Sequence, residues 1–261
     1  MWVTPAPSAL FIHAHPDDES LWTGGTIADL SARGGRTWLI TCTWAEGTHR
    51  HRELLDATAE LGLSEPPVML GYADSFVPDS APGAPRLIDV PFDDQVAQVV
   101  EHIRRLRPEV IVTYNAYGIY GHPDHIHAHR IAAAAADIAA IANYRPDLGP
   151  PWQTSTLYFS TLPQSTVAEL RPFLSAEPNV KITGTAPDKV NVTLDLRNRI
   201  GAKVRAINAH KTELARSKGM QAFMKLPREP QRLFLGWESY RRRDLVPGGR
   251  DLTRNWYFIN P

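Results

Sequence analysis

Cysteine is almost absent from this chain: Cys42 is the only one among 261 residues. A single thiol excludes an internal disulfide and also a zinc site built from several cysteines. Cys42 lies in "TWLITCTW" (37–44), an apolar run that predicts a buried strand, so we expect it to be a small core residue. Any metal site must therefore be built from His, Asp and Glu.

Net charge is also absent, since 28 Lys and Arg balance 28 Asp and Glu. No overall field favours nucleic acid or an anionic membrane, and we expect no nucleic-acid partner. No stretch approaches the roughly 18 to 20 apolar residues of a membrane span. The N-terminal stretch lacks the basic region and cleavage site of a signal peptide. A cytoplasmic protein without a membrane span is expected.

Short apolar runs alternate with helical patterns over the first 145 residues. This alternation predicts an α/β fold, a Rossmann-like and mostly parallel sheet with helices on both faces. In such sheets ligands bind beyond the carboxyl ends of the strands. The expected strands are 9–14, 36–43, 67–72 and 109–114, and the expected helices are 24–33, 52–63, 93–107 and an alanine-rich helix after residue 122.

The second part of the chain is less regular. Two strands are expected at 155–162 and 189–196, and a helix at 197–213. The stretch 227–244 mixes arginines with aromatics and is interpreted as a solvated face with aromatics packed onto the body. We expect one domain over 1–261, with a core at about 8–145 and with 146–261 completing the sheet and the substrate rim. The oligomeric state is left open.

The first unusual stretch is "LFIHAHPDDES" (10–20), where an apolar strand ends in two histidines and three consecutive acids. Neighbouring carboxylates repel one another, so something should neutralise Asp17, Asp18 and Glu19. One interpretation is that the acids stabilise the start of the next helix through its dipole. The other is that they form half of a metal site.

A second cluster, "GIYGHPDHIHAHR" (118–130), follows the fourth strand and repeats the His-Pro-Asp sequence. Both clusters should therefore meet at the carboxyl edge of the sheet. Catalytic zinc sites use three His, Asp or Glu ligands and leave one position for water. One His and one acid from the first loop, with one His from the second, would complete such a site. The spare acid could then accept a proton from the water, and the spare imidazole could assist the leaving species.

The pair "AHPDDE" (14–19) and "GHPDH" (121–125) resembles the zinc-dependent N-acetylglucosaminyl deacetylases of the PIG-L/LmbE type. The resemblance covers at least residues 8–135. Three weaker similarities lie between the two motifs: "TCTWAEG" (41–47), "RHRELLDATAELG" (50–62) with Arg50 and Glu53, and "YADS" (72–75).

The resemblance implies a role for each matching residue. It implies that His15, Asp18 and His125 bind one zinc ion, although His and carboxylate ligands also accept other divalent metals. It implies that Asp17 is the general base. The other implied roles are His122 acting on the tetrahedral intermediate and the leaving amine, Asp124 orienting that histidine, Tyr120 polarising the acyl oxygen, and Arg50 and Asp74 contacting substrate.

The sequence departs from the mycothiol-pathway members of that family. "EGTHRHRE" (46–53) joins the Glu-Gly turn to the next helix almost directly, and the loop at 77–91 is short. Both regions would border the sugar, so a more open rim is expected. We therefore expect an amide hydrolase acting on an N-acetylglucosamine unit of a small glycoconjugate, with a glycopeptide antibiotic pseudoaglycone as the leading candidate. The alternatives are a mycothiol-pathway deacetylase, a mycothiol-conjugate amidase, and a catalytically silent sugar-binding protein.

Overall fold

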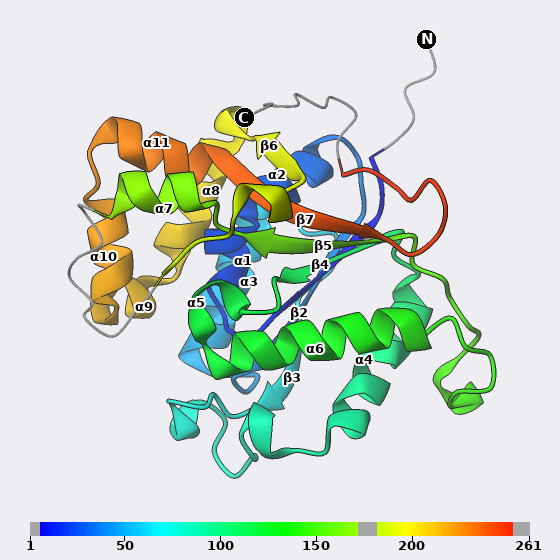
Figure 1. Cartoon of the computed structure of the whole chain (residues 1–261). Coiled ribbons are helices and arrows are strands. Elements are labelled where there is room, and N and C mark those ends of the chain that lie inside the picture. The colour runs from blue at the N-terminus through cyan, green and yellow to red at the C-terminus, as the bar shows by residue number, and fades with distance from the viewer. Residues whose placement is uncertain (1–5, 172–181, 253–261) are drawn as a thin grey trace.

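A seven-stranded sheet with the strand order β3-β2-β1-β4-β5-β7-β6 forms the centre of the computed structural model, which describes residues 6–171 and 182–252 (Figure 1). All adjacent pairs from β3 to β5 are parallel, whereas β7 runs antiparallel to both β5 and β6. The strands are β1 (Ala9–His13), β2 (Thr37–Thr43), β3 (Val68–Tyr72), β4 (Val110–Tyr114), β5 (Thr156–Thr161), β6 (Val192–Asp195) and β7 (Trp237–Asp244).

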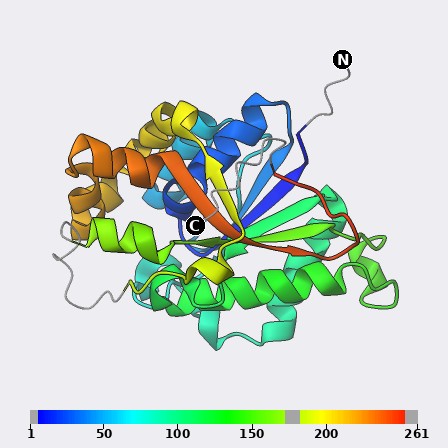
Figure 2. The same cartoon turned by 45° about the horizontal axis from the view of Figure 1, so that its top comes forward.

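Helices cover both faces of this sheet, as the two views in Figures 1 and 2 show. Alternate residues of a strand point to opposite faces. Leu10 and Ile12 of β1 therefore join the core under α4 (Phe92–Leu106) and α6 (Pro123–Ile138). Ala9 and Phe11 join the core on the other face. That face is covered by α2 (Gly24–Ala32), α3 (His49–Leu61) and α8 (Ile200–Ala209).

The remaining helices are short and lie mainly around the carboxyl edge of the sheet (Figure 1). None of the helices within the described ranges is long and apolar enough to cross a membrane. The short helices are α1 (Asp18–Trp22), α5 (Gly118–Gly121), α7 (Gln164–Leu170), α9 (Lys211–Arg216), α10 (Lys218–Met224) and α11 (Arg228–Gly236).

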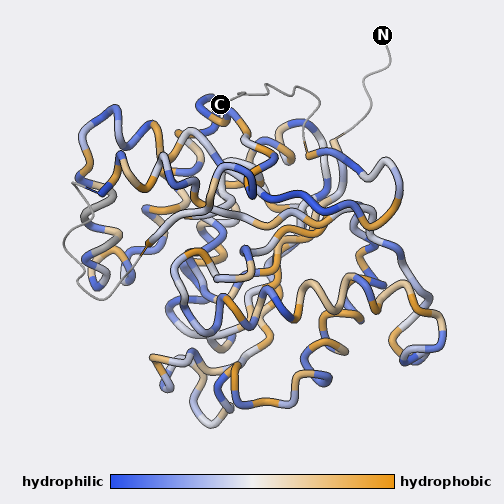
Figure 3. The backbone as a smooth tube through the Cα atoms, in the orientation of Figure 1, coloured by the Kyte–Doolittle hydropathy of each residue, from blue (hydrophilic) through white to orange (hydrophobic). Residues whose placement is uncertain are grey.

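The predicted fold class is confirmed. In residues 227–244, Arg228, Arg241 and Arg243 are exposed while Phe234 and Tyr240 are buried, as expected, but the secondary structure was not predicted. This stretch forms α11 and then β7, which is inserted between β5 and β6. The strand is difficult to recognise from the sequence because most of its residues are polar, and β7 is hydrophilic along most of its length in Figure 3. The helix expected at 197–213 is also interrupted, because α8 ends before His210 and α9 begins after it.

Glu238 explains how a charged strand can enter the interior. Its side chain is buried and accepts hydrogen bonds from the backbone N–H groups of Gly25 (2.8 Å) and Thr26 (3.0 Å) at the start of α2. The ammonium group of Lys203 on α8 lies 2.7 Å from Glu238 Oε1. The hydroxyl of Tyr240 adds a hydrogen bond at 3.0 Å. Glu238 thus joins β7, α8 and the start of α2 through one satisfied carboxylate.

Replacing Lys203 should therefore destabilise the fold strongly. Lys203→Met leaves the buried Glu238 carboxylate without its cation, and breaking such a pair typically costs about 3–5 kcal/mol. Urea-induced unfolding should show this loss in the free energy of unfolding. The matched control is Arg205→Met on the same helix, whose ion pair with Glu60 is solvent-exposed and contributes little. Equal losses in the two variants would contradict this account of Glu238.

Candidate metal centre and active site

The two His-Pro-Asp motifs follow neighbouring strands. β1 and β4 pair in parallel, with Ala9 opposite Val110 and Phe11 opposite Val112, so their carboxyl ends lie side by side. The loop after β1 carries His15 and leads into α1, which begins at Asp18. The segment after β4 leads into α6, whose first turn carries His125. The sheet therefore brings these three side chains together from two places in the sequence.

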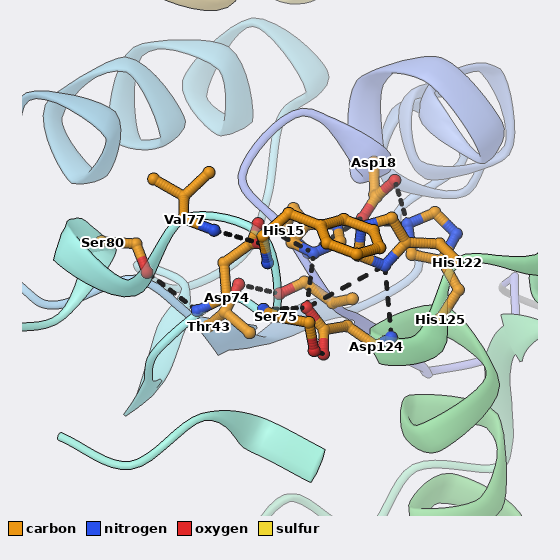
Figure 4. Close-up of polar contacts among 12 residues, drawn as sticks. His15, Asp18, Thr43, Asp74, Ser75, Val77, Ser80, His122, Asp124 and His125 are labelled. Atoms are coloured by element: carbon orange, nitrogen blue, oxygen red, sulfur yellow. Dashed lines mark hydrogen bonds and ion pairs between the residues drawn. The ribbon is translucent and has the colours of Figure 1, made fainter. Parts of the chain in front are cut away.

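These three residues, here called the triangle, lie within 3.3 Å of one another, and Asp18 faces the two histidines with different oxygens. His15 Nδ1 lies 3.1 Å from His125 Nε2 and 3.3 Å from Asp18 Oδ2, and His125 Nε2 lies 3.3 Å from Asp18 Oδ1. Figure 4 shows these side chains converging from separate elements. Ligands placed tetrahedrally about 2.0–2.1 Å from a zinc ion lie about 3.3–3.4 Å from one another. The separations within the triangle are thus close to those between ligands of one zinc ion.

Hydrogen bonds behind the triangle orient two of its members. His125 Nδ1 lies 3.2 Å from the Gly118 carbonyl, which directs Nε2 towards the other donors. Asp18 accepts hydrogen bonds from the Tyr114 hydroxyl (2.6 Å) and from Trp22 Nε1 (3.0 Å). Outer partners of this kind fix the orientation of metal ligands. Gly118 has a positive φ of 63°, and a Cβ there would lie 2.6 Å from the His125 Cβ, so only glycine fits.

The electrostatics also suit a cation. Burial alone would lower the pKa of His15, but the hydrogen bonds that its ring donates to Asp124 and Asp18 outweigh burial and raise that pKa well above its usual value. Burial would raise the pKa of Asp18, but His125 and His15 hold it well below its usual range. Positive charge is therefore stabilised at this point, whether it is carried by a proton or by a metal ion.

A second group of donors lies on the other side of His15. Its Nε2 is 3.2 Å from both Asp74 Oδ2 and Asp124 Oδ2, and His122 completes a set of four potential ligands. These carboxylates already accept hydrogen bonds from neighbouring backbone N–H groups. Ser75 donates to Asp124 at 2.9 Å, and Phe76 donates to Asp74 at 2.7 Å. The triangle through Nδ1 is the set that the family resemblance implies, and it leaves Nε2–H of His15 to donate to two carboxylates.

Asp17, the expected base, occupies a strained position just before α1. Its φ of 127° is rarely adopted by residues other than glycine, a conformation that costs on the order of 1–3 kcal/mol and recurs at functional sites. Burial raises the pKa of Asp17 to about 7, despite the nearby Arg50 guanidinium. A carboxyl group with this pKa can accept and return a proton near neutral pH.

The structure places His122 and Asp124 differently from the arrangement implied by the family. The Asp124 carboxylate lies 3.9 Å from His122 Nδ1, and its closer partners are His15 and Ser75. The backbone N–H of Asp124 donates to His122 Nδ1 at 3.2 Å. Burial and the neighbouring His15 lower the pKa of His122 to about 4, so its neutral ring carries the proton on Nε2. Asp124 therefore orients His122 through its backbone.

Tyr120 and Arg50 have different positions relative to the site. The Tyr120 ring lies 5.0 Å from the His125 ring and 6.1 Å from the His122 ring, centre to centre. Burial and the nearby Asp18 raise the pKa of Tyr120, which keeps its hydroxyl as a donor. Arg50 is only 2% exposed, and its terminal nitrogens contact Asp17, Glu213 and the Pro16 carbonyl. Substrate contact by Arg50 stays a prediction, since these partners already occupy it.

Several supporting residues were not identified from the sequence. Tyr114 is the last residue of β4, and its hydroxyl donates a hydrogen bond to Asp18. The one local indication of this role was the position of a tyrosine at the end of an apolar strand. Glu19 was noticed as one of three acids, but its buried partner His210 lies 191 positions away. Nothing local in the sequence indicates that contact.

A family model described as "PIG-L: GlcNAc-PI de-N-acetylase" matches residues 10–136. A curated relative from Streptomyces scabiei (strain 87.22), 1D-myo-inositol 2-acetamido-2-deoxy-alpha-D-glucopyranoside deacetylase, is 36% identical, with 78% of this chain and 76% of the relative covered. The chain belongs to the PIG-L family. The family's deacetylases depend on zinc, and His15, Asp18 and His125 offer the nitrogen and oxygen donors that zinc takes.

Two solved structures share this fold over most of the chain. N,N'-diacetylchitobiose deacetylase from Pyrococcus horikoshii has a TM-score of 0.65 at 17% identity, with 91% of this chain and 84% of that chain covered. The A40926 pseudoaglycone deacetylase Dbv21 has a TM-score of 0.57 at 18% identity, covering 92% and 99%. The resemblance to the glycopeptide enzyme is thus one of fold. The comparisons favour the mycothiol-pathway alternative over the glycopeptide candidate that led the sequence analysis.

The two donor groups can be separated by substitution. Asp18→Asn should abolish stoichiometric zinc binding because it removes one corner of the triangle, whereas Asp74→Asn should retain about one zinc ion per chain. Elemental analysis of the purified, dialysed variants measures this directly. Asp17→Asn serves as a control that changes a neighbouring acid without removing a ligand. Zinc loss in Asp74→Asn with retention in Asp18→Asn would contradict the assignment of the triangle.

Proposed function

We propose that this protein hydrolyses the acetamide of an N-acetylglucosamine unit in a small glycoconjugate. The observation that carries the proposal is the adjacency of Asp17 to the His15, Asp18 and His125 triangle. Three ligands leave a zinc coordination position open to water, whereas structural zinc sites are closed. A catalytically silent sugar-binding protein would not need a strained carboxyl group with a pKa near 7 beside such a triangle.

Each side chain of the site has a defined part in this reaction. A zinc ion bound to the triangle would supply Lewis acidity towards water and the acetyl carbonyl. Asp17 accepts the proton of the attacking water. His122 Nε2–H and the Tyr120 hydroxyl are the donors available to the negative charge that develops on the acyl oxygen. Asp17 then returns its proton to the departing amine, for which its pKa of about 7 is suitable.

We infer that the first substrate to test is 1D-myo-inositol 2-acetamido-2-deoxy-α-D-glucopyranoside. The support is the activity of the Streptomyces scabiei relative, which is 36% identical and matches most of the chain. The mycothiol-conjugate amidase reaction is a variant of the same proposal, with a larger acyl group. We also propose that the reaction takes place in the cytoplasm.

A glycopeptide pseudoaglycone is the second candidate substrate. The connection from β2 to α3 is short, since β2 ends at Thr43 and α3 begins at His49. Beside the site, the Phe76 side chain is 68% exposed and its ring centre lies 4.7 Å from that of His122. An open rim with an exposed aromatic ring suits a bulky apolar aglycone.

Amine release from the two substrates decides between these candidates. The zinc-loaded protein should release glucosamine-inositol, and release should stop after chelation and return with added zinc. We expect kcat/KM for the inositol conjugate to exceed that for the pseudoaglycone by at least about tenfold, which corresponds to about 1.4 kcal/mol of transition-state binding. The opposite ratio would favour the glycopeptide candidate, and no release from either would contradict the proposed reaction.

Asp17→Asn tests the proposed base. General base catalysis typically contributes about 10²- to 10⁴-fold, so kcat should fall within that range while zinc content is unchanged. The measurement is steady-state amine release together with elemental analysis of the same sample. A variant with bound zinc and full kcat would show that another group receives the proton.

A further inference from the structure

The junction between α8 and α9 reaches the catalytic loop from the far end of the chain. It contains His210, which is fully buried, and Glu213, which is 8% exposed. His210 contacts Glu19 on α1, and Glu213 contacts Arg50 on α3. Glu19 and Arg50 are both hydrogen-bond partners of Asp17. The route through His210 reaches the Asp17 backbone, and the route through Glu213 reaches its carboxylate.

The first route holds the strained backbone of Asp17. The backbone N–H of Asp17 donates to Glu19 Oε2 at 2.9 Å. The other oxygen of Glu19, Oε1, lies 2.7 Å from His210 Nε2. Glu19 and His210 are both fully buried. His210 thus fixes the carboxylate that keeps Asp17 at its positive φ.

The second route holds the carboxylate of Asp17. Arg50 Nη2 lies 3.0 Å from Asp17 Oδ2 and also donates to the Pro16 carbonyl. Arg50 Nη1 donates to Glu213 Oε2 at 2.7 Å. With both ends of the guanidinium group engaged, Arg50 is rigid. Its orientation towards Asp17 therefore depends on Glu213.

Docking of α9 onto the rest of the protein does not depend on this second route. Thr212 donates to the Glu53 carboxylate of α3 from its backbone N–H and from its hydroxyl, both at 2.8 Å. On α8, Lys203 forms the buried ion pair with Glu238. These contacts fix the junction independently of Glu213. The Glu213 carboxylate is shared between Arg50 and the neighbouring Arg216 of the same helix, whose Nη2 lies 2.7 Å from Oε2.

We propose that His210 and Glu213 are positioning residues for the catalytic base, His210 acting through Glu19 and Glu213 through Arg50. The inference rests on the proposed function, because it assumes that Asp17 receives the proton. Under this proposal Arg50 orients Asp17, whereas the family resemblance implied that Arg50 contacts substrate. The C-terminal part of the chain thereby contributes to the chemical step.

Kinetics of Glu213 variants test the proposal with the zinc-loaded protein and the inositol conjugate. Small misplacements of a reacting group can cost up to about 10²-fold, so Glu213→Ala should lower kcat about tenfold while KM stays within about twofold. Glu213→Gln keeps an oxygen acceptor for Arg50 Nη1 and should recover part of the loss. Glu60→Gln is the matched control, since Glu60 also joins α3 to α8 through an arginine but lies far from Asp17 in an exposed ion pair.

Combination with Asp17→Asn separates positioning of the base from any other role. In that background Glu213→Gln should have no further effect on residual kcat, because the group it positions has already been removed. His210→Gln, which can still donate to Glu19, should retain more kcat than His210→Ala. Zinc content and melting temperature are measured for every variant. If Glu213→Ala does not fold, the Gln variant alone decides.

Three results would overturn the inference while leaving the proposed function intact. The first is a rise in KM at unchanged kcat in the Glu213 variants. The second is a loss of kcat from Glu213→Gln that is equal in the wild-type and Asp17→Asn backgrounds. The third is a kcat of the Glu213 variants equal to that of Glu60→Gln. The first would mean that Arg50 and Glu213 bind substrate. Failure of the proposed function is recognised separately, because the wild-type protein would then release no amine from either substrate.

Discussion

Three consecutive acids, one partly buried and two fully buried, impose the constraint on which the rest of the site depends. Asp17, Asp18 and Glu19 lie within one loop and helix start, and each carboxylate needs its own positive partner. Asp18 faces His15 and His125, Asp17 faces Arg50, and Glu19 faces His210. These partners come from the same loop, from α6, from α3 and from the α8–α9 junction. Neutralising the three acids therefore requires the assembly of four segments, and the assembled site is the product.

Metal binding and substrate choice are carried by different parts of the architecture. The triangle lies at the ends of β1 and β4, in the middle of the sheet, where pairing of buried strands leaves little freedom. The rim is formed by connections such as the short one between β2 and α3, and by exposed side chains such as Phe76. Relatives can therefore retain the ligands and differ in the conjugate they accept. This separation explains why the ligand motifs identified the reaction more readily than the substrate.

Much of this arrangement could be predicted from local patterns. The strands of the parallel part and both His-Pro-Asp clusters are visible because apolar periodicity and motif spacing are short-range signals. β7 was missed because its sequence is hydrophilic along most of its length, and the partners of the buried Glu238, Lys203 and the start of α2, lie far away in the sequence. The contacts of His210 and Glu213 join residues far apart in the sequence. Their role depends on tertiary structure, which one sequence does not reveal.

The most direct test of the central claim is a crystal structure of the zinc-loaded protein with anomalous diffraction data at the zinc edge. The account predicts one strong peak about 2.0–2.2 Å from His15 Nδ1, His125 Nε2 and an Asp18 oxygen, with Asp17 beside the open coordination position. A peak among His15 Nε2, Asp74, His122 and Asp124 would contradict it. In that case His122 would be a ligand, and the division of roles between the two His-Pro-Asp motifs would be wrong.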